Sequence, residues 1–329
     1  MTRADQFKAV VDLGFTDRQA RFLVTVMLFS GVCVGRQYCA FAGIVRGQKM
    51  YDFFSSLVAD RWATVCTTAH RRAHLYHVHS RRLYAAIGEP HNRHRKPVTL
   101  ARAVERLMVL DAVLADHRLR WLGSEREKVE YFKLATTLRP TELPHLTFGD
   151  GKRKTVRYFT DKLPIGLAAD GRRHVFLYLV NRKTPVDFRA FLHRHGDVLR
   201  AVPEWEIRLL MPSHFTTALD LYEEAASEEM RRPLRLSQTE EISWYFTQRS
   251  RVDRGAAPEE FGRFRRAERA FRGPRYQALY RQWRTHGEWP VQATASPVLD
   301  DKMSGGRGHV TRLPLTHAYA RIAPMVGSA

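Results

Sequence analysis

The chain has 329 residues, enough for two domains and well above the length at which a hydrophobic core forms. Its 54 Lys and Arg residues oppose 34 Asp and Glu residues, and the formal net charge of +20 favours a partner rich in phosphate. Hydrophobic residues make up 44% of the chain, so we expect most of it to fold. No apolar run reaches the length of a membrane span, and the N-terminus lacks an apolar leader. We therefore expect a cytoplasmic protein without membrane contact.

The segment 14–87 shows three helical patterns followed by two short stretches that alternate apolar and polar residues. A turn at 31–35 separates the first two patterns. The predicted elements are a helix capped by Thr16 and reaching Leu28, a helix over Gln37–Ala42, a helix over Gln48–Val58, and strands over Trp62–Thr67 and His74–His79. Three helices and a hairpin with a basic tip are the order expected of a winged helix-turn-helix, whose third helix enters the major groove of DNA.

Candidate DNA contacts lie in the third helix, next to it and at the tip of the hairpin. Side chains of the helix would meet base edges, and the flanking cations would meet phosphates. The candidates are Arg36, Gln37, Arg46, Gln48, Lys49, Tyr51, Asp52, Arg61, His70, Arg71, Arg72 and His74. From Arg61 to Lys96, eight basic residues oppose Glu89 alone, which favours phosphate binding. The alternative for each candidate is an ordinary solvated polar position.

The three cysteines and the histidines between 70 and 79 are the candidate metal ligands of the chain. Cys33, Cys39 and Cys66 lack a CxxC spacing, so buried free thiols are expected rather than a disulfide framework or a zinc knuckle. Four histidines between 70 and 79 cluster near the tip of the hairpin, but the two arginines among them would repel a cation. We therefore expect neither a metal nor a cofactor. The histidines of the predicted wing are instead expected to face phosphate.

Residues 89–135 are expected to connect two domains. The start of this region reads as a linker, because 88–97 combines glycine, two prolines and a basic cluster. Helical periodicity resumes over Val98–Leu122, which predicts a connector, a dimer-forming helix or the first element of a second domain. Ser124 and Glu127 have the spacing of a capping box at the start of another short helix.

Residues 136–230 are expected to form a small α/β domain after an irregular start at 136–155. The predicted elements are strands over Thr155–Thr160, Leu163–Ala168, His174–Asn181 and Trp205–Met211, and helices from Pro185 to about Val202 and over Phe215–Met230. This order is compatible with a small mixed sheet flanked by helices. The predicted fold class is therefore α+β, with a winged helix-turn-helix over 1–88 followed by this domain.

Residues 231–290 interleave arginine with aromatic residues at helical spacing. The stretch 231–289 holds 14 Arg and seven acidic residues. We expect helices whose aromatic face packs down while Arg265, Arg266 and Arg269 meet phosphate; ordinary solvated helix faces are the alternative. Residues 291–329 are rich in Gly, Ser, Pro and Thr, and they are predicted to be a flexible tail.

The region from 14 to 230 resembles the replication-relaxation and mobilisation accessory proteins of mobile elements. The order of winged helix, connector helices and small α/β domain carries this resemblance, together with Leu163-Pro164-Ile165-Gly166-Leu167 and Leu177-Tyr178-Leu179-Val180-Asn181-Arg182-Lys183-Thr184. The resemblance implies that the second domain has a restriction-endonuclease-like fold. In that fold, the first motif places Pro-Asp before one strand, and the second motif places an acidic residue on the following strand.

The departures from that pattern argue against catalysis. Such a nuclease needs carboxylates that converge on Mg²⁺, with a lysine beside them. The chain has Ile165 at the place of the aspartate and no acidic residue among Tyr178, Leu179 and Asn181, although Lys183 is present. The two nearby carboxylates, those of Asp161 and Asp170, flank the first strand in sequence. We expect a nuclease-like domain without enzymatic activity.

The predicted function is sequence-specific binding of double-stranded DNA by a nucleoid-associated protein of a mobile element. It would act as a transcriptional regulator or as an accessory factor in DNA mobilisation or replication. The α/β domain would mediate dimerisation, or it would hold DNA or a partner enzyme. Two alternatives stay open: a Mg²⁺-dependent nuclease that uses other carboxylates, and an RNA-binding or ribonucleoprotein component favoured by the arginine-aromatic segment.

Overall fold

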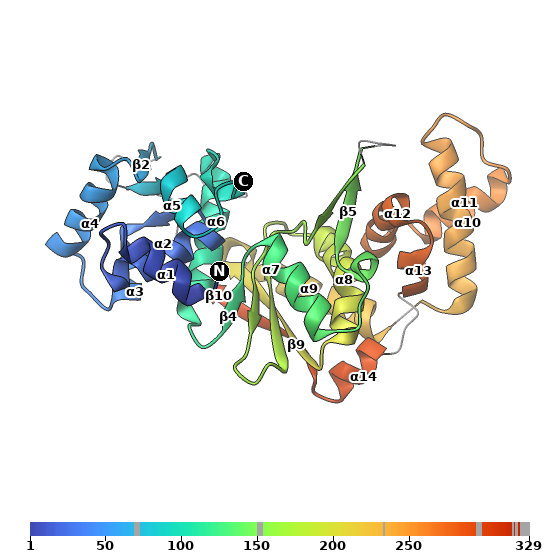
Figure 1. The fold of residues 1–329 in the computed structure, drawn as a ribbon. Coiled ribbons are helices and arrows are strands. Elements are labelled where there is room, and N and C mark those ends of the chain that lie inside the picture. The colour runs from blue at the N-terminus through green and yellow to red at the C-terminus, as the bar shows by residue number, and fades with distance from the viewer. Residues whose placement is uncertain are drawn as a thin grey trace. The chain divides into compact units, whose positions relative to one another are not determined.

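The computed structural model has a mixed α+β fold with several small sheets, which confirms the broader fold class predicted from the sequence (Figure 1). The structure describes residues 1–68, 73–149, 154–232, 234–293, 298–317, 319 and 322. The chain divides into two compact units. The first comprises Met1–Gly123, Leu210–His214 and Pro314–Ala329, and the second comprises Ser124–Leu209 and Phe215–Leu313.

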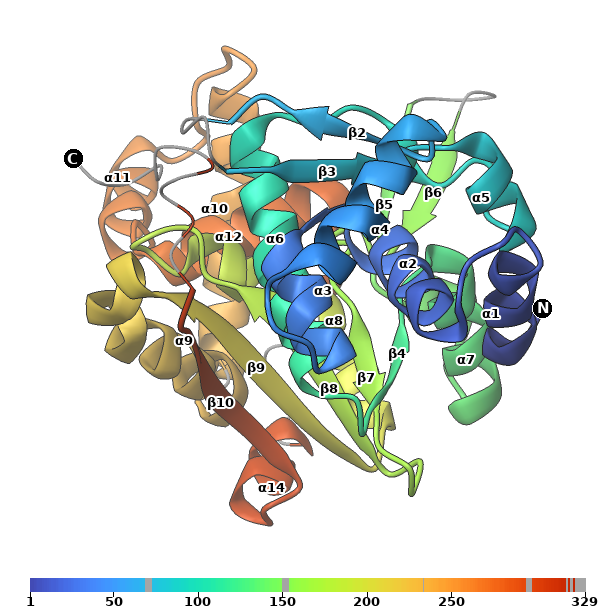
Figure 2. The ribbon, with the colours of Figure 1, turned by 90° about the vertical axis from the view of Figure 1, so that its left-hand side faces the viewer.

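The first unit combines helices with a three-stranded antiparallel sheet of order β1-β3-β2, whose strands β2 and β3 run side by side in Figure 2. Its elements are α1 (Arg3–Val11), α2 (Asp17–Phe29), β1 (Val32–Val34), α3 (Gly35–Ala42), α4 (Gln48–Ala59), β2 (Ala63–Cys66), β3 (Leu75–Val78), α5 (Arg81–Ala86), the 3-10 turn η1 (Arg93–Arg95), α6 (Leu100–Ala115) and β4 (Arg120–Leu122). The three predicted helices and both predicted strands are confirmed within a few residues.

Local signals explain where these helices begin and end. The hydroxyl of Thr16 accepts from the backbone of Gln19, and the Gln19 side chain accepts from the backbone of Thr16, so α2 starts with a complete capping box. Gly43 ends α3 in the left-handed region at φ 63°, which glycine adopts without steric cost. The rings of Phe22, Tyr38 and Phe53 from α2, α3 and α4 meet in the core below these helices.

Four features of the first unit differ from the predictions. Helices α1 and α5 and the strand β1 were not expected, and β1 occupies the place of the predicted turn at 31–35. The stretch 88–97, expected to be a linker, instead packs on the fold. His94 is buried there, and its carbonyl oxygen lies 2.9 Å from Nε2 of His77. Gly31 leaves room for this stretch, since a Cβ at that position would lie 2.5 Å from the His94 carbonyl oxygen.

The second unit contains many helices, a β5-β6 hairpin and a sheet. In the sheet, β7 to β10 are neighbours in the order β10-β9-β8-β7. Its elements are α7 (Glu125–Ala135), η2 (Pro140–Glu142), β5 (His145–Phe148), β6 (Thr155–Tyr158), β7 (Ile165–Leu167), β8 (Arg173–Leu179), α8 (Val186–Ala201), β9 (Glu204–Pro212), η4 (Ser213–Ala218), α9 (Leu219–Arg231), α10 (Leu236–Val252), α11 (Phe261–Ala270), α12 (Pro274–His286), α13 (Trp289–Ala293), α14 (Val298–Ser304) and β10 (Gly308–Leu315). Ends of β9 and β10 belong to the first unit. The capping box of Ser124 and Glu127 is confirmed at the start of α7.

Several predicted boundaries in this part of the chain need correction. The helix predicted over Val98–Leu122 ends at Ala115, and the region 136–155, expected to be irregular, contains β5. Within the tail predicted to be flexible, α14 and β10 are regular elements. The ammonium of Lys302 explains part of this, because it donates to the carbonyls of Leu199, Arg200 and Val202 at the end of α8. Burial lowers the pKa of Lys302 to about 8.

Candidate nucleic-acid interface

The outer face of α4 is the most promising recognition surface of the first unit. Its inner face buries Met50, Phe53, Phe54 and Leu57, which is why the helix lies flat on the core. Gln48 and Asp52 share the outer face one turn apart, and the amide of Gln48 donates to the carboxylate of Asp52 at 2.6 Å. Both groups are exposed, and each would have to leave the other before it could bond to a partner.

Cations and one aromatic ring flank that pair. Arg46 and Lys49 are exposed, and Tyr51 is 46% exposed. The guanidinium of Arg46 lies 5.9 Å from the centre of the Tyr51 ring. Among the described residues, neither Arg46 nor Lys49 forms an ion pair with a carboxylate. The start of α4 is thus positively charged and open to an anion.

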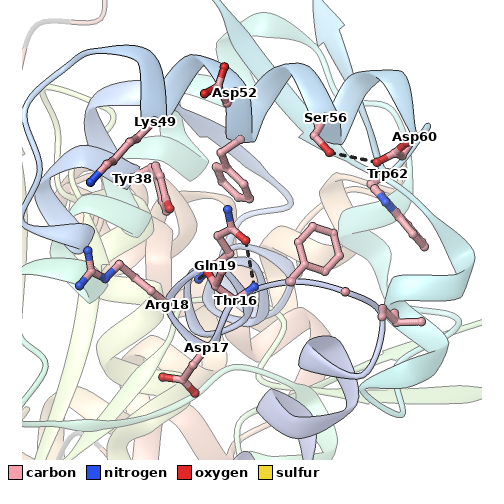
Figure 3. A pocket seen from close by; sticks show the side chains of 14 residues that line it. Thr16, Asp17, Arg18, Gln19, Tyr38, Lys49, Asp52, Ser56, Asp60 and Trp62 are labelled. Atoms are coloured by element: carbon pink, nitrogen blue, oxygen red, sulfur yellow. Dashed lines mark hydrogen bonds between the residues drawn. The ribbon is translucent and has the colours of Figure 1, made fainter.

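A hollow of about 820 Å³ opens on one flank of α4 (Figure 3). It is bounded by the start of α2, by Tyr38 of α3 and by the α4 residues Lys49, Asp52, Phe53 and Ser56. The hydroxyl of Ser56 donates to Asp60 at 3.0 Å, and the carboxylate of Asp52 points away from the centre of the hollow. The walls mix both signs of charge with aromatic rings, so the hollow extends the polar flank of α4 rather than forming a site with one sign of charge.

Arginines gather beyond the far end of α4. Arg61 directly follows the helix with φ 58°, a left-handed conformation that bends the chain into β2. Arg81 and Arg82 begin α5 and are exposed, and the guanidinium of Arg82 lies 5.6 Å from the centre of the Trp62 ring. Sequence reasoning selected Arg61 but passed over Arg81 and Arg82. The signal that could have found them is Ser80, whose hydroxyl caps α5 and so presents both arginines in its first turn.

Two predicted contacts at the start of α3 are corrected by the structure. Gln37 is buried; its amide donates to Asp111 and to the carbonyl of Leu107, so it cannot reach a base. Arg36 forms a two-pronged ion pair with Asp111 at 2.9 and 2.7 Å and also donates to the hydroxyl of Tyr319 at 2.7 Å. These polar groups join α3 to α6 and to Tyr319, and although the Arg36 side chain is 36% exposed, its guanidinium is occupied by Asp111 and Tyr319.

The connection between β2 and β3, predicted to be the wing, is described only in part. His74 is exposed next to β3, whereas His70, Arg71 and Arg72 lie outside the described residues. His77, which was weighed as a metal ligand, is buried, and burial lowers its pKa. Cys33 and Cys39 are buried free thiols, as predicted, while Cys66 is partly exposed.

In the second unit, Arg265, Arg266 and Arg269 are all exposed on α11, as expected. Arg265 donates to Glu268 at 2.6 Å. Phe264 and Ala267 are buried on the opposite face of the helix, where they join a core shared with α10, α12 and α13. The predicted division between an aromatic face and an arginine face is thus confirmed for Phe264 and Ala267, but Phe261, which shares their helical spacing and was expected to pack down with them, is 69% exposed.

The carboxylates weighed as nuclease ligands have other partners. Asp161 is buried beside His195, with 3.1 Å between Oδ2 and Nε2. Burial by itself would raise the pKa of Asp161, but His195, Lys128 and Arg194 hold it well below its ordinary value. Asp161 is therefore engaged in an ion pair within the fold.

Asp170 and Lys183 do not lie in a comparable environment. Asp170 is exposed and accepts from the backbone of Arg172 at 2.9 Å in the turn before β8, and Lys183 is exposed after that strand. Within the described ranges, no group of three or more His, Cys, Asp or Glu side chains is arranged to hold a metal ion.

Comparisons with known proteins add no assignment. The chain matches no protein-family model, no curated protein and no solved structure. None of the helices in the described part of the chain is both long and apolar enough to cross a membrane.

Proposed function

We propose that the chain is a DNA-binding protein whose first unit reads duplex DNA as a winged helix-turn-helix. The order of elements supports this: α2 is followed by β1, α3 and α4 lie on either side of a short turn, and β2 and β3 close an antiparallel sheet of order β1-β3-β2. In this arrangement α4 is the recognition helix and the connection between β2 and β3 is the wing. Residues 1–123 carry 19 Lys and Arg residues against nine Asp and Glu, which suits a polyanion.

The observation that carries the proposal is the outer face of α4, where base-reading groups lie between cations. The Gln48 amide can pair with the N6 and N7 edge of adenine, and the Asp52 carboxylate can accept from the N4 amino group of cytosine. Lys49 and Arg46 at the start of the helix and Arg61 beyond its end would meet phosphates. Breaking the Gln48–Asp52 hydrogen bond is part of the cost of specific binding.

The biological role that fits this site is that of a mobile element's regulator or accessory factor in DNA mobilisation or replication. The sequence resemblance over 14–230 to mobile-element proteins, which implies a nuclease-like domain at 136–230, supports this role, and the carboxylate of Asp161 pairs with His195 rather than facing an open site. The second unit then serves as a non-catalytic platform for a second copy of the chain or for a partner enzyme.

Binding of the full-length chain to duplex DNA is expected to weaken steeply with salt. About five phosphates neutralised by the α4 and α5 cations would give a slope of log affinity against log salt of about −4 to −5. The duplex is first selected from a random library with the full chain, and its affinity is then measured by fluorescence anisotropy at several salt concentrations. A slope shallower than about −2 would mean that few phosphates are contacted and would contradict the docking.

Variants of the two kinds of contact are expected to behave differently. Gln48→Ala should cost about 1–3 kcal/mol on the selected duplex and little on unrelated duplexes, because it removes a base contact. The double change of Arg81 and Arg82 to alanine should weaken every duplex alike. Lys8→Ala is the matched control, since Lys8 is an exposed cation on α1 that pairs with Asp12. Equal losses on all duplexes from both changes would remove the recognition role of α4.

A further inference from the structure

Helix α11 is a ten-residue helix with two contrasting faces in the helical part of the second unit. Its buried face contributes Phe264 and Ala267 to a core with Tyr245, Phe246 and Leu279. The rings of Tyr245 and Phe264 lie 5.6 Å apart in this core. Phe264 and Ala267, together with Arg263 beside them, hold α11 on α10, and the opposite face of α11 is exposed.

The uncovered face carries an aligned set of side chains, which we call the α11 stripe: Phe261, Arg265, Arg266 and Arg269. Phe261, Arg265 and Arg269 follow one another at intervals of four residues, so they line one side of the helix about 6 Å apart. The Phe261 ring is 69% exposed, an unusual position for a large apolar side chain in a helix that has a core to pack against. An exposed aromatic ring therefore lies in line with two guanidinium groups.

Neighbouring arginines of the same helices are used differently. The guanidinium of Arg263 lies 3.9 Å from the centre of the Trp244 ring and is paired with Glu241, and Arg249 lies 4.3 Å from the centre of the Tyr280 ring. In contrast, no ion pair links Arg266 or Arg269 to a carboxylate among the described residues. Arg249 and Arg263 thus stabilise the fold. Arg265 faces outward beside Glu268, and Arg266 and Arg269 face outward with no carboxylate at ion-pair distance among the described residues.

We propose that the α11 stripe binds a single strand of DNA, with its arginines on successive phosphates and Phe261 stacked on one unpaired base. An aromatic ring can stack only on a base whose face is uncovered, which a duplex does not offer along its length and a single strand does. The spacing of the arginines along the helix suits consecutive phosphates of an extended strand. The choice of DNA over RNA rests on the proposed function, in which the first unit binds duplex DNA. A strand separated from that duplex would then occupy the α11 stripe.

The test uses the full-length chain and a labelled oligothymidine of about twenty nucleotides, a length that can span an ordinary single-strand site. Anisotropy titrations compare the native protein with Phe261→Ala and with the double variant R266E/R269E. We expect affinity for oligothymidine to fall about tenfold in Phe261→Ala and at least as much in the double variant. Affinity for the selected duplex should change less than twofold in both. The double variant removes no ion pair seen among the described residues, so thermal unfolding should be unchanged.

The control variant is K133E/K183E, which makes the same change in net charge at two exposed lysines of the same unit that form no ion pair among the described residues. It should leave oligothymidine binding within twofold of the native value; an equal loss in the control would show a general charge effect and overturn the proposal. Tighter binding of an oligouridine with the same dependence on the stripe would assign the surface to RNA and overturn the choice of DNA. Loss of duplex binding in the Gln48 and Arg81/Arg82 variants, with oligothymidine binding intact, tests the proposed function separately.

Discussion

Glu229→Ala is expected to lower the free energy of unfolding by about 3–5 kcal/mol, because it leaves buried cations without their counter-ion. The Glu229 side chain is 1% exposed on α9. Its carboxylate lies 2.7 Å from Arg189 and 3.0 Å from His193 on α8, and 3.3 Å from Arg275 on α12. Burial alone would raise the pKa of Glu229, but these three partners hold it below its ordinary value. One carboxylate therefore joins three helices of the second unit.

The measurement is urea unfolding of the full-length chain followed by circular dichroism and tryptophan fluorescence. Glu228→Ala is the matched control. Glu228 is 30% exposed and contacts Arg189 at 2.5 Å, so its loss should cost at most about 1 kcal/mol. Glu229→Gln, which keeps the shape of the side chain without its charge, should fall between the two. A loss below about 1 kcal/mol for Glu229→Ala would show that the cations find other partners or water, and would refute the linking role of this carboxylate.

Asp161→Ala is expected to destabilise the chain by about 3 kcal/mol through the loss of its buried ion pair with His195. The Asp161 and His195 side chains are 11% and 2% exposed. Residues on both sides of Asp161 hold left-handed conformations, with φ 46° at Phe159 and 65° at Lys162, so the turn that presents this carboxylate is held in place against steric cost. The loss should be the same with and without Mg²⁺, since the carboxylate acts on His195. Asp170→Asn is the control and should change stability little.

The same pair predicts a dependence on pH. Because the folded state holds the pKa of Asp161 well below its ordinary value near 3.9, the folded protein binds fewer protons at this group than the unfolded chain does. Its contribution to stability is therefore complete above about pH 4 and is lost as the pH falls towards the folded value. The stability of Asp161→Asn should decrease less steeply between about pH 4 and pH 2 than that of the native chain. Parallel curves for the two proteins, or Mg²⁺-stimulated DNA cleavage abolished by Asp161→Ala, would contradict this account.

The sequence by itself determined most of the local structure, because the signals that start, stop and orient a helix lie within a few residues of it. Thr16 with Gln19, and Ser124 with Glu127, marked the starts of α2 and α7, and Gly43 marked the end of α3. The apolar spacing of α4 and α11 was enough to predict that Phe53, Phe54 and Phe264 would be buried. It also predicted the exposure of the α11 arginines, but it wrongly placed Phe261 on the packed face.

Only the tertiary structure decided which polar residues are available to a partner. Arg36 and Gln37 have the composition of DNA contacts, but Asp111, 75 and 74 residues away, occupies both of them. The sequence showed only that Asp161 lies before a strand, and the tertiary structure placed its distant partner His195 beside it. The tail became α14 and β10 because Lys302 reaches carbonyl groups about 100 residues earlier in the chain. A buried charge needs a partner wherever the chain can supply one, and no local spacing in the sequence reveals where that partner is.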